Sequence, residues 1–125
     1  MSRSKNIKWV GVLLVPLVLL IAGCASQYPQ EKIDTFAKCL TEKDTKIYGT
    51  FWCPKCAKQK KMFGSSFKLL TYIECDARGE NEQSSLCMEK NVNKYPDWEF
   101  ADESRAVGVL SFDELSEKTG CVVPE

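Results

Sequence analysis

The fold is decided by the stretch Phe51-Trp52-Cys53-Pro54-Lys55-Cys56. An apolar run at residues 47–52 leads into this C-x-x-C, and a lysine-rich segment that suits a helix follows at residues 57–63. A strand that runs into a C-x-x-C at the start of a helix is the arrangement that dithiol–disulfide exchange uses. The free N–H groups and the dipole of a helix N-terminus stabilise a thiolate, the species that attacks a disulfide. The sequence therefore predicts an exchange site at Cys53 and Cys56.

The composition excludes several classes of function. The 125 residues carry 17 basic and 17 acidic side chains, and subtracting the basic residues Arg3, Lys5 and Lys8 at the N-terminus leaves 14 against 17. A mildly acidic domain gives no support for nucleic-acid binding. The chain has no histidine, which excludes a histidine general base and histidine metal ligands.

The first 24 residues have the pattern of an export signal or membrane anchor. Residues 1–8 carry only basic charges, and the apolar run at residues 9–23 is shorter than the roughly 20 residues of a membrane-spanning helix. It closes on Ile21-Ala22-Gly23-Cys24, which resembles a bacterial lipobox, so we expect Cys24 to be lipidated. The alternative is an uncleaved anchor helix. Both place residues 25–125 outside the cytoplasm and tethered to a membrane, in the periplasm or at the outer face of the cell membrane.

After a linker at residues 25–30, residues 31–125 are predicted to form one domain. Hydrophobic periodicity and capping signals predict helices at residues 31–42, 54–63, 86–92 and 112–118. Apolar runs and alternation predict strands at residues 46–52, 67–75, 95–100 and 105–110. This order is an α/β layout of thioredoxin type, with a central mixed sheet flanked by helices and the C-x-x-C between the first strand and its helix.

The remaining cysteines point to disulfides. Setting Cys24 aside leaves six, an even number in an oxidising compartment: Cys39, Cys53, Cys56, Cys75, Cys87 and Cys121. A structural disulfide between Cys75 and Cys87 would fasten the polar loop that they bracket, and the alternative is a second redox pair that relays electrons from Cys56. Cys39 and Cys121 then pair by elimination. The sequence alone does not choose among the possible pairings.

The two cysteines of the C-x-x-C are expected to differ in role. Cys53, nearest the strand end, is the expected nucleophile, and Cys56 resolves the mixed disulfide by attacking Cys53. Lys55 lies between them in the sequence, and its positive charge is expected to favour the Cys53 thiolate. Pro54 suits the first helical position, where its missing N–H costs nothing. The alternatives are a structural disulfide or part of a zinc site, which would need Cys75 and Cys87 as further ligands.

The chain resembles the thioredoxin-like domains associated with bacterial homologues of vitamin K epoxide reductase. The resemblance is carried by Phe36-Ala37-Lys38-Cys39-Leu40, Tyr48-Gly49-Thr50-Phe51-Trp52-Cys53-Pro54-Lys55-Cys56, Gln59-Lys60-Lys61-Met62-Phe63-Gly64, Tyr72-Ile73-Glu74-Cys75, Cys87, Tyr95-Pro96-Asp97-Trp98 and Gly120-Cys121. It implies electron transfer from exported protein substrates to a separate membrane partner, a vitamin K epoxide reductase-like or similar quinone-linked oxidase. No metal and no organic cofactor is expected beyond the dithiol. Many members have histidine at the position of Lys55.

The resemblance also assigns roles around the cysteines. It implies that Pro96, after Tyr95, is a cis proline facing the C-x-x-C, and the alternative is a trans proline at the start of an edge strand. Thioredoxins have a buried acid on the strand before the C-x-x-C, where this chain has Ile47. Glu74 could replace that acid as a proton shuttle, although an exposed or salt-bridged carboxylate is the simpler interpretation. The lysines on the helix, Lys58, Lys60 and Lys61, are expected to form a solvated face. Trp52 is expected at the active-site surface and Trp98 in the core.

The sequence thus predicts a membrane-tethered thiol–disulfide oxidoreductase that forms or isomerises disulfides in exported proteins. One alternative is a reductase with the opposite direction of electron flow. Another is a non-catalytic binding module in which Cys53 and Cys56 form a fixed disulfide or hold a metal.

Overall fold

A computed structural model describes residues 27–125, so the expected signal segment and Cys24 lie outside the described residues. The elements follow one another along the chain as α1 (Gln30–Glu42), β1 (Lys46–Gly49), α2 (Pro54–Phe63), the 3-10 helix η1 (Gly64–Leu69), β2 (Thr71–Glu74), α3 (Ser84–Glu89), β3 (Asp97–Glu99), β4 (Arg105–Val107) and α4 (Phe112–Thr119). Within this part of the chain, no helix has the length and apolarity needed to cross a bilayer.

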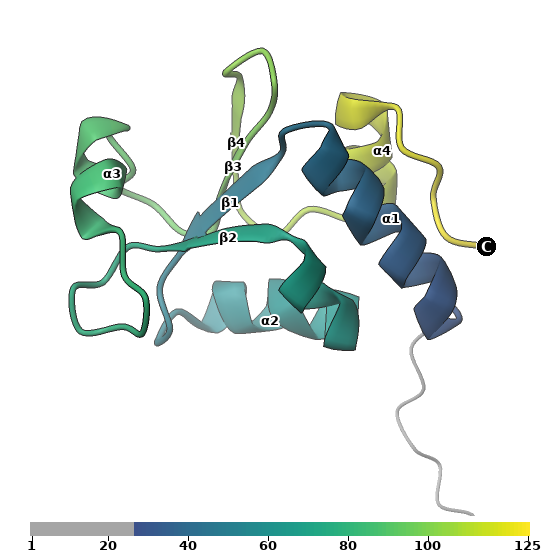
Figure 1. The fold of residues 1–125 in the computed structure, drawn as a ribbon, viewed down its shortest axis with the longest axis horizontal. Helices are drawn as coiled ribbons and strands as arrows, with labels where there is room; N and C mark the ends of the chain where they lie inside the picture. The colour runs from purple at the N-terminus through teal and green to yellow at the C-terminus, as the bar shows by residue number, and fades with distance from the viewer. Residues whose placement is uncertain (1–26) are drawn as a thin grey trace, which may run out of the picture.

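The four strands form one mixed sheet in the order β2-β1-β3-β4 (Figure 1). The pair β1/β2 is parallel, and the pairs β1/β3 and β3/β4 are antiparallel. Helix α2 runs along one side of the sheet, while α3 stands at the far end from α1 and α4 (Figure 1). This arrangement is a thioredoxin-like fold, as the sequence predicts.

Side chains alternate between the two faces of the strands and build two separate cores. Ile47 of β1 and Trp98 of β3 belong to the larger core, which α1, α2 and α4 cover with Phe36, Phe63 and Phe112. The ring centroids of Phe63 and Phe112 lie 5.0 Å apart in a T-shaped contact, a geometry that adds to the apolar burial. Trp98 has no exposed surface, which confirms its expected core position.

The second core lies on the opposite face of the sheet, beneath α3. It contains Tyr48, Ile73, Cys87 and Val92, with Cys75 packed against it. The disulfide between Cys75 and Cys87 joins the end of β2 to α3 and closes this core. A second disulfide, between Cys39 and Cys121, joins α1 to the segment after α4.

Several strands are shorter than the sequence predicts. Strand β1 ends at Gly49 because the chain turns at Thr50. The carbonyl of Thr50 accepts a hydrogen bond from the backbone N–H of Cys53 at 3.3 Å. The second strand begins at Thr71 instead of residue 67. Phe67 belongs to η1, where its ring packs on Phe63 and on Tyr72, and this tertiary contact overrides the apolar run.

The last two strands and the third helix also differ from the prediction. Strands β3 and β4 occupy three residues each, and α3 begins two residues before the predicted start and ends at Glu89. All residues of β3 are buried, although alternation predicts a half-buried strand, because Asp97 and Glu99 have cationic partners on one face. The capping box at Ser111 and Glu114 forms as predicted at the start of α4.

Candidate active site

Cys53 is the N-cap residue of α2, the position at which a helix offers unpaired N–H groups. Its sulfur accepts a hydrogen bond from the backbone N–H of Cys56 at 3.3 Å, and Pro54 occupies the first turn of the helix. Both cysteines are free thiols and both are buried, Cys53 with 7% and Cys56 with 2% of its surface exposed. A sulfur at this position receives an N–H bond and lies at the positive end of the helix dipole.

The segment between α3 and β3 lies directly against Cys53. The peptide bond between Tyr95 and Pro96 is cis. The Cys53 thiol donates to the carbonyl oxygen of Tyr95 at 3.9 Å, and Pro96 is fully buried. The Tyr95–Pro96 segment and the C-x-x-C are thus brought together although more than a third of the described chain separates them.

Cys56 lies deeper than Cys53, between α2 and the strands. Burial, followed by the hydrogen bond with Cys53, raises the pKa of its thiol from 9.0 to about 12. The backbone of Thr50 and the charge of Lys60 act in the opposite direction. At neutral pH Cys56 is therefore a neutral thiol, and it needs a base before it can attack a disulfide.

Gly49 makes room for this buried sulfur. A Cβ atom at Gly49 would lie 2.9 Å from the sulfur of Cys56 and 3.0 Å from the ring atom Cε2 of Tyr72. Real side chains do not tolerate such contacts, so a residue with a side chain at this position would displace Cys56 or Tyr72.

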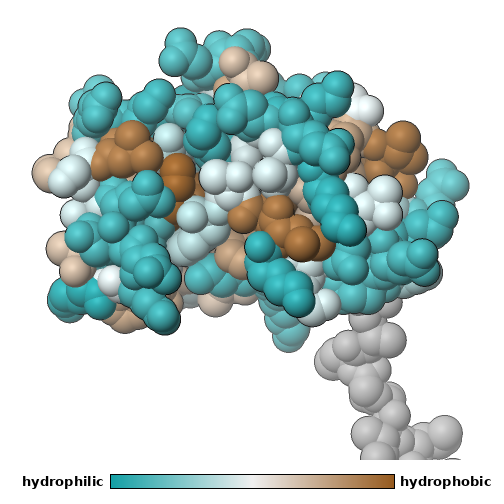
Figure 2. All heavy atoms as spheres, in the orientation of Figure 1, coloured by the Kyte–Doolittle hydropathy of each residue, from teal (hydrophilic) through white to brown (hydrophobic). Residues whose placement is uncertain are grey.

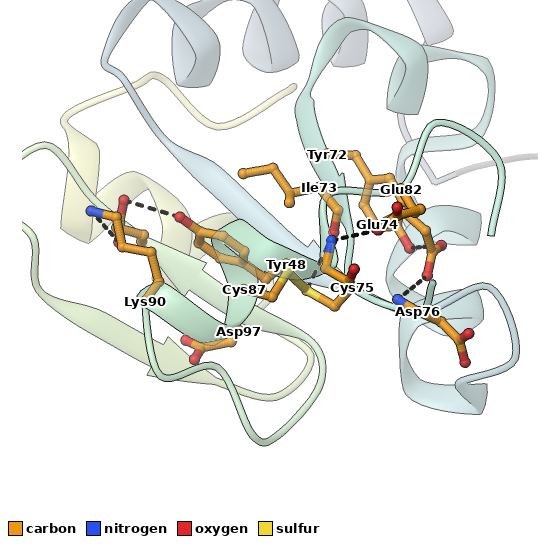
Figure 3. Close-up of a disulfide and its surroundings, with 12 residues drawn as sticks. Tyr48, Tyr72, Ile73, Glu74, Cys75, Asp76, Glu82, Cys87, Lys90 and Asp97 are labelled. Atoms are coloured by element: carbon orange, nitrogen blue, oxygen red, sulfur yellow. Dashed lines mark hydrogen bonds and ion pairs between the residues drawn. A yellow bond between two sulfur atoms is a disulfide. The ribbon is translucent and has the colours of Figure 1, made fainter. Parts of the chain in front are cut away.

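Glu74 is neither exposed nor salt-bridged, which corrects the simpler interpretation of the sequence. It is 5% exposed, and among residues 27–125 no lysine or arginine lies within ion-pair distance of it. The phenol of Tyr72 donates to Glu74 Oε2 at 2.9 Å, and the backbone N–H of Asp76 donates to Glu74 Oε1 at 3.0 Å (Figure 3). Its hydrogen bonds therefore come from neutral donors.

The expectation of a fully solvated lysine face on α2 is wrong for one of its three members. Lys58 and Lys61 are exposed. The ammonium of Lys60, however, lies over the ring of Tyr72, 4.4 Å from its centroid, and over that of Phe67 at 5.4 Å. Lys60 thus brings a positive charge to the side of Cys56.

The exposed rim of the site consists of Phe51 and Trp52, each with 54% of its surface exposed. The indole N–H of Trp52 donates to Asp76 Oδ2 at 2.6 Å, and the guanidinium of Arg78 lies 5.8 Å from the Phe51 ring centroid. Arg78 binds the same carboxylate through two of its nitrogens, and this hydrogen bonding holds the pKa of Asp76 well below its usual range. Both aromatic side chains are therefore held by one loop, beside the cysteines.

A cavity of about 380 Å³ opens next to this rim. It reaches from Trp52 and Tyr95 to α3 and is lined further by Thr50, Cys75, Asp76, Ala77, Ser84, Cys87, Met88 and Val92. Met88 is 73% exposed at its edge. On the face of the molecule drawn in Figure 2, apolar side chains reach the surface only in small separate patches among hydrophilic ones.

The disulfide of Cys75 and Cys87 lies across the sheet from Cys56. Tyr48 and Ile73 pack beside it in the core beneath α3 (Figure 3). Cys56 faces Gly49 and Tyr72 on the α2 side. This placement favours a structural role and leaves Cys75 and Cys87 unavailable as thiolate ligands. Within the described part of the chain, no group of three or more potential ligand residues could hold a metal ion.

Sequence reasoning missed Tyr72 and Gly49 as parts of the site. The available signal was their register, since Tyr72 and Glu74 lie two residues apart on one strand and so share a face. Gly49 pairs directly with Glu74 across the parallel ladder. Lys55 is exposed, and its expected influence on Cys53 stays a prediction.

Comparison with known proteins agrees with this chemistry. No family model matches the chain. Over 88 residues, 67% of its length, the chain is 35% identical to the thiol-disulfide oxidoreductase LTO1 of Arabidopsis thaliana. The chain spans only 23% of the length of that relative. The similarity supports a thiol–disulfide oxidoreductase-like identity and a redox function in general for the site around Cys53 and Cys56.

Proposed function

We propose that the chain is a membrane-tethered, extracytoplasmic thiol–disulfide oxidoreductase that forms or isomerises disulfides in exported proteins through Cys53 and Cys56. One observation carries the proposal. A free cysteine caps a helix N-terminus beside the carbonyl of Tyr95, with a second free cysteine directly behind it.

The difference in burial supports different roles for the two sulfurs. Cys53 follows the exposed Trp52 and contacts the carbonyl of Tyr95, whereas the more deeply buried Cys56 lies against Gly49. A substrate sulfur approaching from solvent meets Cys53 first. In the oxidised protein, a substrate thiolate attacks the sulfur of Cys53, the Cys53–Cys56 bond breaks, and Cys56 leaves as a thiolate that takes up one proton.

A second substrate thiolate then completes the transfer. It attacks the substrate sulfur of the mixed disulfide, the substrate disulfide forms, and Cys53 leaves as a thiolate. Two electrons have passed from the substrate dithiol to the protein dithiol. A membrane quinone-linked oxidase, similar to vitamin K epoxide reductase, would take up these electrons and restore the Cys53–Cys56 disulfide.

The proposed location rests on two features of the chain. Disulfides persist in oxidising compartments. The described residues contain two disulfides, Cys39–Cys121 and Cys75–Cys87, in addition to the free thiols of Cys53 and Cys56. The N-terminal basic and apolar segments, ending at Cys24, are typical of an export signal with lipid attachment.

The test is a trapping experiment with the full chain expressed in a bacterial cell envelope. Cys56→Ser removes the resolving thiol, so we expect mixed disulfides between Cys53 and substrate proteins to accumulate and to vanish on reduction. Cys53→Ser is the matched control and should trap none. Absence of adducts in Cys56→Ser would favour the non-catalytic binding module instead.

A further inference from the structure

We propose that Tyr72 and Glu74 form a proton relay for Cys56: Tyr72 exchanges the thiol proton with the buried carboxyl group of Glu74. The inference rests on the proposed exchange reaction and extends it to two residues on β2. It concerns the step in which the reduced protein closes its disulfide, and the reverse of that step.

Cys56 cannot exchange its proton directly with solvent, because only 2% of its surface is exposed. Its thiol is also a weak acid in this environment, with a pKa raised to about 12 by burial. Closing the disulfide requires the thiolate, so a group near the sulfur must accept the proton. Ile47, on the strand that precedes the C-x-x-C, has no ionisable group.

Tyr72 is placed to receive this proton. The sulfur of Cys56 and the phenol oxygen of Tyr72 flank the same point, the position that a Cβ of Gly49 would occupy, at 2.9 Å and 3.3 Å respectively. The two atoms are therefore no farther apart than the sum of these distances. General acid–base transfer can cross a gap of this size through one bridging water molecule.

The phenol is already connected to an acceptor. It donates to Glu74 Oε2 at 2.9 Å, so it can release its own proton as it gains another. Glu74 is held in place by the N–H of Asp76 and by Gly79, which packs so closely against its Cγ that a Cβ there would overlap it. Among residues 27–125 no lysine or arginine pairs with Glu74, so no cation occupies its carboxylate oxygens.

The surrounding charges suit this direction of transfer. Lys60 lies 4.4 Å from the ring centroid of Tyr72 and lowers the pKa of Cys56, which stabilises the thiolate as it forms. Burial, the hydrogen bond to Glu74 and the nearby sulfurs raise the pKa of Tyr72, so the phenol itself stays neutral between transfers. The ionisable groups that face the relay are Cys53, Cys56 and Lys60 from α2, Asp76 from the loop after β2, and Tyr95.

The step balances in atoms and electrons. Cys56 gives its proton to a bridging water, which passes a proton to the Tyr72 oxygen as Tyr72 gives its own proton to Glu74 Oε2. The Cys56 sulfur bonds to the Cys53 sulfur, the bond from Cys53 to the partner sulfur breaks, and the partner leaves as a thiolate. The protein loses the two electrons that the partner disulfide gains. When the disulfide opens, the proton returns along the same path.

The experiment separates closure of the disulfide from the attack that precedes it. The reduced full chain reacts with dithiobis-nitrobenzoate, which releases one coloured thiolate when Cys53 attacks and a second when Cys56 closes the disulfide. Both rate constants are measured from mildly acidic to alkaline pH. Any background from other thiols is subtracted with the Cys53→Ser variant.

Tyr72→Phe keeps the ring and its contact with Lys60 but removes the phenol oxygen. We expect the second release to slow by about tenfold or more at neutral pH, while the first release keeps its rate. The difference should disappear at alkaline pH, where hydroxide takes the proton from Cys56. Glu74→Gln, which keeps the size of the side chain, should show the same pattern if Tyr72→Phe does not fold.

Tyr48→Phe is the matched control, because Tyr48 is a buried tyrosine on the opposite face of β1, with its phenol 3.4 Å from Glu99. It should change neither phase. Unchanged closure in both relay variants, or equal slowing of both phases, would overturn the relay. A wild-type chain that shows no second release would instead overturn the proposed exchange reaction.

Discussion

The backbone N–H of Cys56 donates a hydrogen bond to the sulfur of Cys53 at 3.3 Å. The bond is possible because Cys53 is the N-cap residue and Cys56 lies in the first turn of α2. The two cysteines are unequal, since the outer sulfur accepts this N–H hydrogen bond while burial raises the pKa of the inner thiol. The predictions below follow from this inequality and from the packing around it.

Substitution of Gly49 should disturb Cys56 and Tyr72 together. In Gly49→Ala the new Cβ would lie 2.9 Å from the Cys56 sulfur, so neighbouring groups must shift, at a cost of about 1–3 kcal/mol in the free energy of unfolding. Denaturant unfolding measures this cost, and Gly49→Val should lose more. Equal stability of wild type and both variants would contradict the close approach.

The reduced protein should lose stability at alkaline pH because of Cys56. Its pKa is raised in the folded state, so the folded chain holds this proton more tightly than the unfolded chain. The stabilisation is complete below the ordinary value of 9.0 and is lost as the pH rises toward about 12. The slope cannot exceed about 1.4 kcal/mol per pH unit for one proton.

Comparison of reduced wild type with Cys56→Ala isolates this effect, because the tyrosines with raised pKa values, Tyr48, Tyr72 and Tyr95, are present in both proteins. The difference in unfolding free energy between the two proteins should shrink above the ordinary thiol value. A difference that stays constant with pH would show that Cys56 titrates alike in the folded and unfolded chains.

The two disulfides should contribute unequally to stability. Their cysteines are separated by 82 residues for Cys39 and Cys121 and by 12 for Cys75 and Cys87. In the loop-entropy account, the larger loop stabilises by about 4–5 kcal/mol and the smaller by about 3 kcal/mol. Thermal unfolding of the two double alanine variants should follow this order, and both should keep the two-phase thiolate release of Cys53 and Cys56.

Arg105 is expected to be a major stabilising residue that takes no part in exchange. Its guanidinium binds Asp97 through two nitrogens and lies 3.2 Å from Glu99, and both carboxylates are buried. Arg105→Gln leaves these charges poorly compensated and should cost about 3 kcal/mol in unfolding free energy.

Arg78 provides the matched control, because it makes the same two-nitrogen contact with Asp76 at the surface. Its side chain is 75% exposed against 25% for Arg105. Arg78→Gln should therefore have a much smaller effect on stability. Equal losses in the two variants would show that burial does not set the contribution of these pairs.

The sequence predicts the order of the elements because each carries a local signal. The capping box at Ser111 and the proline after Cys53 mark helix starts, and Gly64 marks the end of α2. The strand ends could not be predicted. The apolar pattern predicts Phe67 in a strand. Phe67 instead lies in η1, because its ring makes tertiary contacts with Phe63 and Tyr72.

The site, too, has features that the local sequence predicts and features that depend on tertiary contacts. The proposed roles of Cys53 and Cys56 follow from their spacing and from the helix that begins between them. The burial of Glu74 could not be predicted, because it depends on Tyr72 and on the loop from Asp76 to Gly79, which folds over the carboxylate. No local sequence pattern predicts the contact between this loop and the Glu74 carboxylate.

The central claim is tested most directly by the equilibrium reduction potential of Cys53 and Cys56 in the full chain, poised against glutathione buffers. The oxidised fraction is read by alkylation and mass spectrometry of the peptide that contains both residues. A disulfide-forming enzyme should equilibrate at about −120 to −180 mV. A value near about −270 mV would reverse the proposed direction of electron flow. A pair whose oxidation state does not respond to the buffers would contradict the exchange reaction itself.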